Sequence, residues 1–202
     1  MDNGKGFWDR FARLYAPVQE RSNAKLYEQV AVLCAPYITA ETDVLELGCG
    51  SGQLTLPLCG NARSWKATDF SENMIRELAR RCPPSVTPAV RDATDLPYGD
   101  SSFQAALIAN TLHIMPEPEK ALGEIYRVLS PGGVLLAPAF VYEGRPNRPR
   151  MWLMTKLGFP SFYEWTFAQL EAFLVEKGFE TLQKELIPGD PLPEGFIAVR
   201  KV

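Results

Sequence analysis

The segment from Val44 to Gly52, VLELGCGSG, constrains the fold more than any other part of the chain. It contains an apolar run that ends in three alternate glycines. Apolar runs of this length are typical of buried parallel strands. Glycines let the backbone turn sharply into a helix while a ligand lies against it. The segment therefore predicts a strand, a ligand-binding loop and a helix, in that order.

The spacing of the glycines indicates which ligand the loop binds. A dinucleotide-binding loop reads G-x-G-x-x-G, which needs a glycine at position 53, where this chain has Gln53. Here the pattern is E-x-G-x-G-x-G, with Glu46 two residues before Gly48. It resembles the glycine loop of class I S-adenosylmethionine-dependent methyltransferases. An NAD(P)-dependent reductase is disfavoured further because no tyrosine is followed by lysine four residues later.

The resemblance extends over roughly positions 40 to 140 and implies S-adenosylmethionine as cofactor, with S-adenosylhomocysteine as product. It implies that Asp69 accepts hydrogen bonds from the ribose, as an acid at this distance does in nucleoside-binding α/β folds. In the family, the residue that corresponds to Phe70 lies against the adenine ring. The residue that corresponds to Asp92 accepts a hydrogen bond from the adenine amino group. The residues expected to bind the cofactor are Tyr15, Glu46, Gly48, Cys49, Gly50, Gly52, Asp69, Phe70, Met74, Asp92, Ala93 and Asn110.

Two later motifs narrow the resemblance. Residues 91–97, RDATDLP, are similar to the family's D-A-x-x-L-P. Residues 127–133, RVLSPGG, resemble the R-V-L-K-P-G-G of small-molecule methyltransferases of type 11, which are related to quinone-biosynthesis enzymes. The resemblance implies methyl transfer to a small molecule by in-line displacement, on oxygen, nitrogen, sulfur or carbon. Such a reaction needs positioning more than a nucleophile on the protein.

Strand and helix signals alternate along the chain, which favours a Rossmann-like α/β fold with helices on both faces of a parallel sheet. We expect strands at 43–47, 64–68, 87–90, 103–109, 133–140, 181–187 and 195–201, the last two forming an antiparallel hairpin. The family resemblance supplies the order 3-2-1-4-5-7-6 for these seven strands, with strand 7 antiparallel. We expect one domain over 1–202, with an N-terminal helical lid (1–35), a cofactor-binding core (40–140), an acceptor-side insertion (141–165) and a C-terminal helix and hairpin (166–202).

Local signals predict three helices and one surface ion pair. Ser71 is the expected N-cap of a helix that runs to Arg81, and a second helix covers 118–129. Residues 166–169, TFAQ, form a capping box that opens a third helix, which ends at Gly178. Glu124 and Arg127 are three residues apart on the second helix, and a solvated pair is enough to explain them.

Aromatic residues gather in two stretches that the cofactor-binding motifs leave free, one from 7 to 15 and one from 140 to 165. We expect a small apolar or aromatic acceptor between them, in contact with Phe7, Phe11, Trp152 and Tyr163. The alternative is that these rings fill the core. His113 is the only histidine and follows a predicted strand, so it is the candidate general base; otherwise it hydrogen-bonds a loop carbonyl.

Composition excludes several other classes of protein. A net charge of −3 provides no positive field for nucleic acid. The four cysteines are widely spaced, which argues against a zinc site or a disulfide framework, so no metal is expected. With no spanning segment or signal peptide apparent, we expect a cytoplasmic monomer or weak homodimer. Methylation of a peptide or protein group, and a non-catalytic cofactor-binding partner subunit, remain as alternatives.

Overall fold

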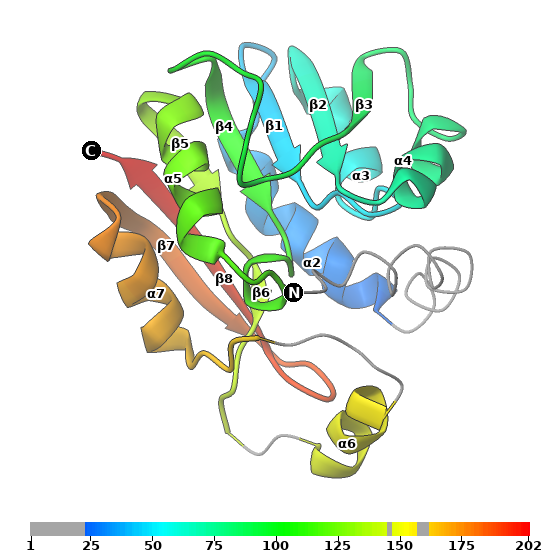
Figure 1. Cartoon of the computed structure of the whole chain (residues 1–202), viewed down its shortest axis with the longest axis vertical. Coiled ribbons are helices and arrows are strands. Elements are labelled where there is room, and N and C mark those ends of the chain that lie inside the picture. Colours follow the sequence, from blue (N-terminus) through cyan, green and yellow to red (C-terminus); the bar gives the residue numbers. More distant parts are fainter. Residues whose placement is uncertain (1–22, 145–146, 157–161) are drawn as a thin grey trace.

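A computed structural model describes residues 23–144, 147–156 and 162–202 of the chain. In these residues a central sheet lies between two layers of helices (Figure 1). The strands are β1 Asp43–Leu47, β2 Ser64–Asp69, β3 Val86–Val90, β4 Phe103–Ile108, β5 Leu129–Leu136, β6 Ala139–Phe140, β7 Phe179–Ile187 and β8 Glu194–Lys201. The helices are α2 Ala24–Cys34, α3 Thr55–Leu58, α4 Glu72–Ala79, α5 Pro118–Val128, α6 Arg148–Lys156 and α7 Phe167–Glu176, with 3₁₀ turns η1 Ala35–Tyr37, η2 Cys59–Asn61 and η3 Leu112–Ile114.

The strand order confirms the predicted topology. The sheet reads β3-β2-β1-β4-β5-β8-β6, with β7 paired to the other side of β8. Strands β1 to β5 are parallel, and β8 runs antiparallel to β5, β6 and β7. Because β6 is a short continuation of β5 along β8, the order corresponds to 3-2-1-4-5-7-6 with the seventh strand reversed. The final hairpin formed by β7 and β8 is also as predicted.

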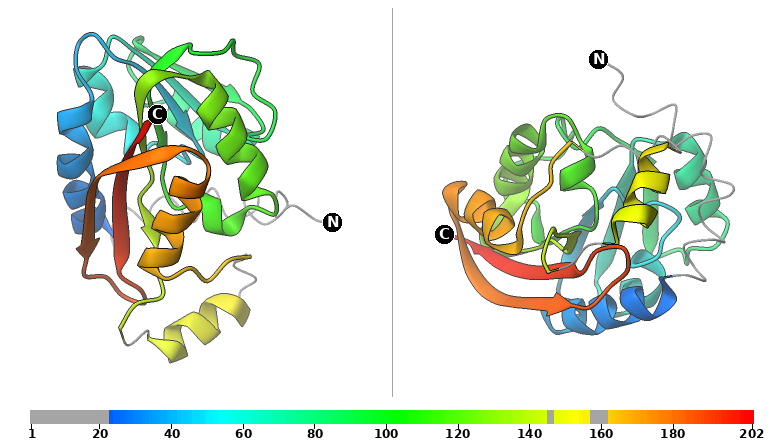
Figure 2. Two further views of the ribbon diagram at one scale, coloured as in Figure 1. Left: turned by 90° about the vertical axis from the view of Figure 1, so that its left-hand side faces the viewer. Right: turned by 90° about the horizontal axis from the view of Figure 1, so that it is seen from below.

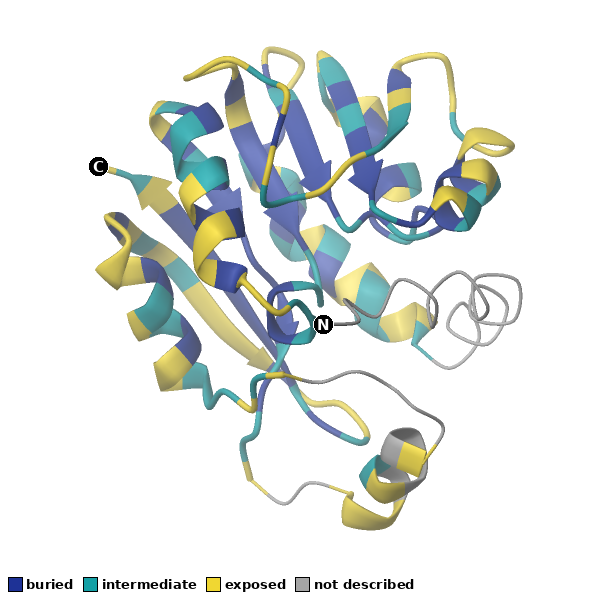
Figure 3. Ribbon diagram, viewed as in Figure 1, coloured by how far each residue is buried: buried dark blue, intermediate teal, exposed yellow. Residues whose placement is uncertain are grey.

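Helices cover both faces of the sheet, as expected (Figure 2). On one face α2, α3 and α4 pack over a buried cluster that includes Val44, Trp65 and Phe196. On the other face α5 and α7 pack over a cluster that includes Leu47 and Ile197. Figure 3 shows that buried residues concentrate in the strands between these layers. Among the described residues no helix has both the length and the apolar character needed to cross a membrane.

The fifth strand differs from the prediction of 133–140. It begins at Leu129, directly after α5, and is interrupted at 137–138 before it resumes as β6. Proline has no backbone N–H to donate to a sheet. Pro138 therefore ends the ladder, and its carbonyl oxygen accepts a bond of 2.8 Å from the backbone N–H of Asn110. The interruption thus links the ends of β4 and β5 at one edge of the sheet.

The predicted helix caps are present. The Ser71 side chain accepts from the backbone N–H of Met74 at the start of α4. Both bonds of the capping box between Thr166 and Gln169 are formed at the start of α7. Gly178 follows α7 with a φ of +95°, a conformation that glycine adopts without strain. Short-range sequence patterns therefore predicted where these helices begin and end to within a few residues.

The expectation that Glu124 and Arg127 form only a solvated pair is wrong. Arg127 donates to the carbonyl oxygens of Leu96 (3.0 Å) and Tyr98 (2.7 Å) as well as to Glu124, and Glu124 accepts from the Leu96 backbone N–H (2.8 Å). The two side chains thus hold the segment from Arg91 to Ser102, which contains no helix, against α5. Spacing along one helix does not reveal partners that a distant loop contributes.

Candidate functional site

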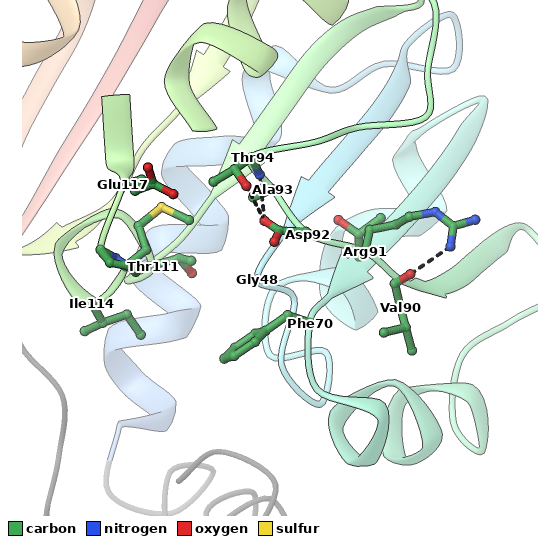
Figure 4. A pocket seen from close by; sticks show the side chains of 13 residues that line it. Gly48, Phe70, Val90, Arg91, Asp92, Ala93, Thr94, Thr111, Ile114 and Glu117 are labelled. Carbon is green, nitrogen blue, oxygen red and sulfur yellow. Dashed lines mark hydrogen bonds between the residues drawn. The ribbon is translucent and has the colours of Figure 1, made fainter. Parts of the chain in front are cut away.

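The loops that follow the parallel strands meet at the carboxyl edge of the sheet, where open α/β folds bind ligands. They enclose a cavity of about 320 Å³, within the usual range for small-molecule sites. In Figure 4 the loop after β3, with Asp92, faces the loop after β4, with Thr111, across this cavity. The lining residues are Gly48, Thr68, Phe70, Val90, Arg91, Asp92, Ala93, Thr94, Thr111, Ile114, Met115, Pro116 and Glu117.

The glycine loop after β1 owes its close packing to the missing side chains. Gly48, Gly50 and Gly52 all have positive φ, at +65°, +54° and +98°. A Cβ atom at Gly48 would lie 2.2 Å from Oγ1 of Thr111, and one at Gly52 would lie 2.6 Å from Cδ1 of Leu78. The loop is therefore held against the loop that follows β4 and against α4, with Gly48 itself on the cavity wall.

Asp69 fixes the conformation of this loop. Its Oδ2 accepts a bond of 2.9 Å from the Gly50 backbone N–H, and its Oδ1 accepts one of 2.9 Å from that of Ser71. The residue is 7% exposed and is not among the cavity-lining residues. The contact of Asp69 with the ribose stays a prediction.

The residues predicted to hold adenine lie together in the cavity. Phe70 follows β2, while Asp92 and Ala93 follow β3, and all three line the same space. Oδ1 of Asp92 accepts from the backbone N–H (2.8 Å) and the hydroxyl (2.7 Å) of Thr94, which fixes the carboxylate at the wall. An aromatic ring, a fixed carboxylate and a close backbone at Gly48 are the groups that a nucleoside requires, so the residues present fit S-adenosylmethionine.

Glu46 lies in the interior rather than on the cavity wall. The side chain is 2% exposed, and its Oε2 accepts from the Thr55 hydroxyl (2.5 Å) and the Trp65 indole N–H (2.8 Å). Burial raises the pKa of its carboxyl to about 7, although these two hydrogen bonds favour the ionised form. In the structure Glu46 joins β1 to α3 and β2 beneath the glycine loop, and its predicted contact with the cofactor is untested.

Cys49 and Met74 are also buried beneath the cavity. Cys49 is 4% exposed, and burial raises the pKa of its thiol, so it is an unreactive neutral group. Met74 is 3% exposed at the start of α4. Neither is among the cavity-lining residues. Cys34, Cys59 and Cys82 are free thiols as well.

Asn110 bridges three strand ends at the carboxyl edge. It has a φ of +51°, its Nδ2 donates to Oε1 of Glu194 (2.9 Å), and its Oδ1 accepts from the Phe140 backbone N–H (2.9 Å). Asn110 immediately precedes Thr111, which packs against Gly48. Its side chain therefore orients the loop that forms the cavity wall, whereas a direct contact of Asn110 with the cofactor remains a prediction.

His113 lies in η3 and is 5% exposed. Burial lowers the pKa of its imidazole to about 4, so the ring is neutral at pH 7. Its Nδ1 has no hydrogen-bonding partner among the described residues, and its ring lies edge-on to that of Phe140, with 6.3 Å between the centroids. Its backbone carbonyl accepts from the N–H groups of Phe162 and Tyr163.

Of the four predicted acceptor contacts, the described residues include Tyr163 and Trp152, and neither lines the cavity. Tyr163 stacks on Trp165 with the ring centroids 4.9 Å apart, and Trp165 stacks on Phe173 of α7 in the same way. Trp152, on α6, is 63% exposed and lies apart from the cavity. Phe7 and Phe11, together with the predicted cofactor contact Tyr15, lie outside the described residues.

Sequence reasoning missed the residues that form the second wall of the cavity. Thr111 and the run from Ile114 to Glu117 come from the loop after β4, and Arg91 and Thr94 flank Asp92. Their position directly after predicted parallel strands was a usable signal, because those ends converge at one edge. Arg91 and Thr94 belong to the motif at 91–97, whereas no motif marked Thr111 or the run from Ile114 to Glu117.

Comparisons with known proteins agree with this geometry. Residues 45–137 match the protein family described as "Methyltransferase domain". A demethylmenaquinone methyltransferase from Paenarthrobacter aurescens is 38% identical over 103 residues, a match that covers 51% of this chain and 40% of that protein. This chain spans less than half the length of the relatives it matches.

Solved structures show the same fold over a larger part of the chain. A methyltransferase from Thermotoga maritima, described as a possible histamine N-methyltransferase, superposes with a TM-score of 0.79 over 98% of this chain and 99% of its own, at 22% identity. A methyltransferase bound to the Trm112 activator of Haloferax volcanii superposes with a TM-score of 0.79 over 96% and 98%, at 18% identity. At these identities the likeness shows the fold alone.

Proposed function

We propose that this protein transfers a methyl group from S-adenosylmethionine to a small apolar or aromatic acceptor. The proposal starts from residues 45–137, which form a class I methyltransferase domain of the type 11 kind. The observation that carries the proposal is the glycine loop, held against Thr111 by Gly48 and against Asp69 by Gly50, beside a cavity lined by Phe70 and Asp92. The bound cofactor supplies an electrophilic methyl group on its sulfonium.

The chain's own residues contribute binding and orientation. Phe70, Asp92 and Ala93 would hold the adenine end of the cofactor, and Gly48 to Gly50 with Asp69 would hold its ribose and methionine end. The cavity walls exclude water, which strengthens the polar contacts inside them. Orientation of this kind supplies about 7–11 kcal/mol of rate enhancement in well-aligned reactions, which supports a mechanism without a protein nucleophile.

An apolar or aromatic acceptor is supported by the rings beside η3. Tyr163, Trp165 and Phe173 form a continuous stack, and the Tyr163 backbone bonds to His113 at the same edge of the sheet. The matched relative acts on demethylmenaquinone, by its name, and a compound with a similar ring system is our first candidate acceptor.

Calorimetry tests the cofactor assignment directly. We expect S-adenosylhomocysteine to bind and NADH to give no binding heat, since Gln53 occupies the position of the third glycine in the dinucleotide pattern. Mass spectrometry of the purified protein for retained S-adenosylhomocysteine is an independent check. Binding of NADH in the absence of S-adenosylhomocysteine binding would overturn the proposal.

The role of His113 as a general base is a separate proposal. Its neutral ring at pH 7 is able to accept a proton, although burial makes it a weak base. The His113→Gln variant should retain cofactor affinity and lose turnover by about 10²–10⁴-fold if a proton leaves in the rate-limiting step. A loss of less than about threefold would assign His113 a structural role.

The alternatives are separated by products rather than by binding. A screen with a labelled methyl donor should yield a labelled small molecule. Label in a peptide or protein would instead favour methylation of a peptide or protein group. A non-catalytic partner subunit would bind S-adenosylhomocysteine and label nothing. The observation that favours this alternative is that the structural neighbour from Haloferax volcanii forms a complex with an activator protein. We also propose that the protein acts in the cytoplasm as a monomer or weak homodimer, without nucleic acid.

A further inference from the structure

Two buried side-chain atoms of the described residues have no hydrogen-bonding partner, and both lie at the same corner of the sheet. They are Nδ1 of His113 and Oε2 of Glu194. Their residues are 5% and 1% exposed. Buried polar atoms are nearly always satisfied in native proteins, because each unpaired one costs free energy. Two such atoms in one place therefore indicate a polar group that the described residues do not supply.

Phe140 and Asn110 connect the two residues. Glu194 begins β8 and pairs with Phe140 across the antiparallel ladder, and the ring of Phe140 lies beside that of His113. Asn110 donates to Oε1 of Glu194 at 2.9 Å and lies three residues before His113 in the same loop. This loop also carries Thr111 on the wall of the cofactor cavity. Neither His113 nor Glu194 lines the cavity, and this loop connects their corner to its wall.

The chemistry of the two atoms is complementary. Burial raises the pKa of the Glu194 carboxyl to about 8, so it is protonated at pH 7. Because Oε1 already accepts from Asn110, the proton belongs on Oε2, which then needs an acceptor. A neutral imidazole has one nitrogen that accepts, so Nδ1 of His113 is available to take a hydrogen bond. One hydroxyl group satisfies both atoms, since it accepts and donates at once.

We infer that Glu194 and His113 form a hydroxyl-binding pair in the acceptor site, in which the acceptor's hydroxyl oxygen accepts from Glu194 and its proton is shared with His113. The inference rests on the proposed function for the presence of an acceptor at this edge. The ring of Phe140 lies beside His113, and the cluster on this face of the sheet, which includes Cys34 and Phe196, is buried and apolar, so the remainder of the ligand is apolar. The substrate class is a phenol or a similar hydroxyl-bearing ring compound.

Fluorescence titration of the full chain with 2-naphthol and with naphthalene, in the presence of S-adenosylhomocysteine, tests the pair. Sites built to bond a hydroxyl reject analogues that lack it. We expect 2-naphthol to bind at least about tenfold more tightly than naphthalene. Glu194→Met should remove about tenfold of the 2-naphthol affinity and leave that of naphthalene within about twofold.

Two further variants keep the test decisive if Glu194→Met does not fold. Glu194→Gln retains an acceptor for Asn110 and a donor for the ligand, so its affinity for 2-naphthol should stay within about threefold of the wild type. His113→Leu should lower the preference for 2-naphthol over naphthalene by a factor similar to that for Glu194→Met. Tyr126→Phe is the matched control, because it removes a hydrogen bond to the Val202 carbonyl far from this edge and should change neither affinity.

The possible outcomes separate the two proposals. If S-adenosylhomocysteine binds but the wild type takes up 2-naphthol no more tightly than naphthalene, the two atoms are satisfied by water and the inference is wrong, while the proposed function stands. The same conclusion follows if His113→Leu leaves the preference unchanged. If S-adenosylhomocysteine does not bind in calorimetry, the proposed function fails, and with it the acceptor site on which the inference rests.

Discussion

The carboxyl edge of the sheet has two halves that differ in how fully the chain satisfies its own buried polar groups. At the ends of β1 and β2, the carboxylates of Glu46 and Asp69 accept hydrogen bonds from side chains or backbone N–H groups of the chain itself. At the ends of β4 and β8, His113 and Glu194 each retain an unpaired buried atom among the described residues. The first half is preorganised by the chain, and the second half requires a group from outside these residues.

The largest expected effect comes from Gly48→Ala, which disrupts the preorganised half. The new Cβ would lie 2.2 Å from Oγ1 of Thr111, at a φ of +65° that disfavours side chains. The loop must shift, and we expect the affinity for S-adenosylhomocysteine in calorimetry to fall by more than about 100-fold. Gly60→Ala is the matched control, since nothing lies within 4 Å of its Cβ position. Equal affinities for the two variants would contradict the importance of this packing.

Asp69→Ala should weaken the binding of S-adenosylhomocysteine by about 10–100-fold, because each lost hydrogen bond to a charged group costs about 1.5–3 kcal/mol. In the structure it frees the backbone N–H groups of Gly50 and Ser71. Asp43→Asn is a suitable control, since Asp43 pairs with Arg63 at the start of β1, the opposite end of that strand. Normal binding by Asp69→Ala would refute both the predicted ribose contact and the role of Asp69 in fixing the loop.

The variant Glu194→Gln tests the second half through the pH dependence of the free energy of unfolding. The folded protein keeps the Glu194 proton up to a pKa of about 8, whereas the unfolded chain releases it near the ordinary value of 4.5. The free energy of unfolding of the wild type should therefore fall as pH rises from 4.5 to 8, by about 1.4 kcal/mol per unit of pKa difference as an upper limit. Glu194→Gln has no such proton, so urea titrations at pH 5 and pH 8 should show a smaller fall.

The corresponding change in the first half provides the control for that experiment. Burial raises the pKa of Glu46 only to about 7, with two hydrogen bonds opposing the rise. Glu46→Gln should therefore remove a pH dependence confined to a narrower interval, between about 4.5 and 7. If Glu194→Gln and the wild type lose stability in parallel from pH 5 to pH 8, Glu194 is not buried in its protonated form.

The smallest expected effect concerns the loop that carries Asp92. Arg127→Met removes the bonds from the guanidinium to the carbonyls of Leu96 and Tyr98 while it preserves the apolar part of the side chain. We expect a loss of about 1–2 kcal/mol in the free energy of unfolding. The affinity for S-adenosylhomocysteine should fall by less than about tenfold. Arg76→Met is the control, because Arg76 pairs with Glu72 and donates to Asn73 on the exposed face of α4.

The preorganised half was largely predictable from the sequence. The glycine spacing after Leu47 and the acid at Asp69 follow from the backbone conformations and polar groups that a nucleoside site requires, and both are local in the chain. The strand order needed the family resemblance, because periodicity does not determine which strands are neighbours. The caps at Ser71 and Thr166 were predictable because they depend on neighbouring residues only.

The second half was not predictable for the opposite reason. Glu194 lies 84 residues after Asn110, and no pattern in the sequence joins them. Arg127 was assigned to a solvated surface because its partners at Leu96 and Tyr98 belong to a loop without regular structure. His113 was recognised as a lone histidine, but its burial beside Phe140 brings together segments 27 residues apart. Contacts between distant segments decide the chemistry of this half.

The reversed direction of β8 has a consequence for how the acceptor side of such a fold varies. The parallel strands bring their last residues to the carboxyl edge, but β8 brings its first, Glu194, together with the link at 188–193 that precedes it. A change in the length or composition of that link alters this corner without disturbing the pairing of β1 to β5. The fold thus separates the cofactor-binding loops after the parallel strands, which stay constant, from a hairpin whose tip is free to change in sequence and length.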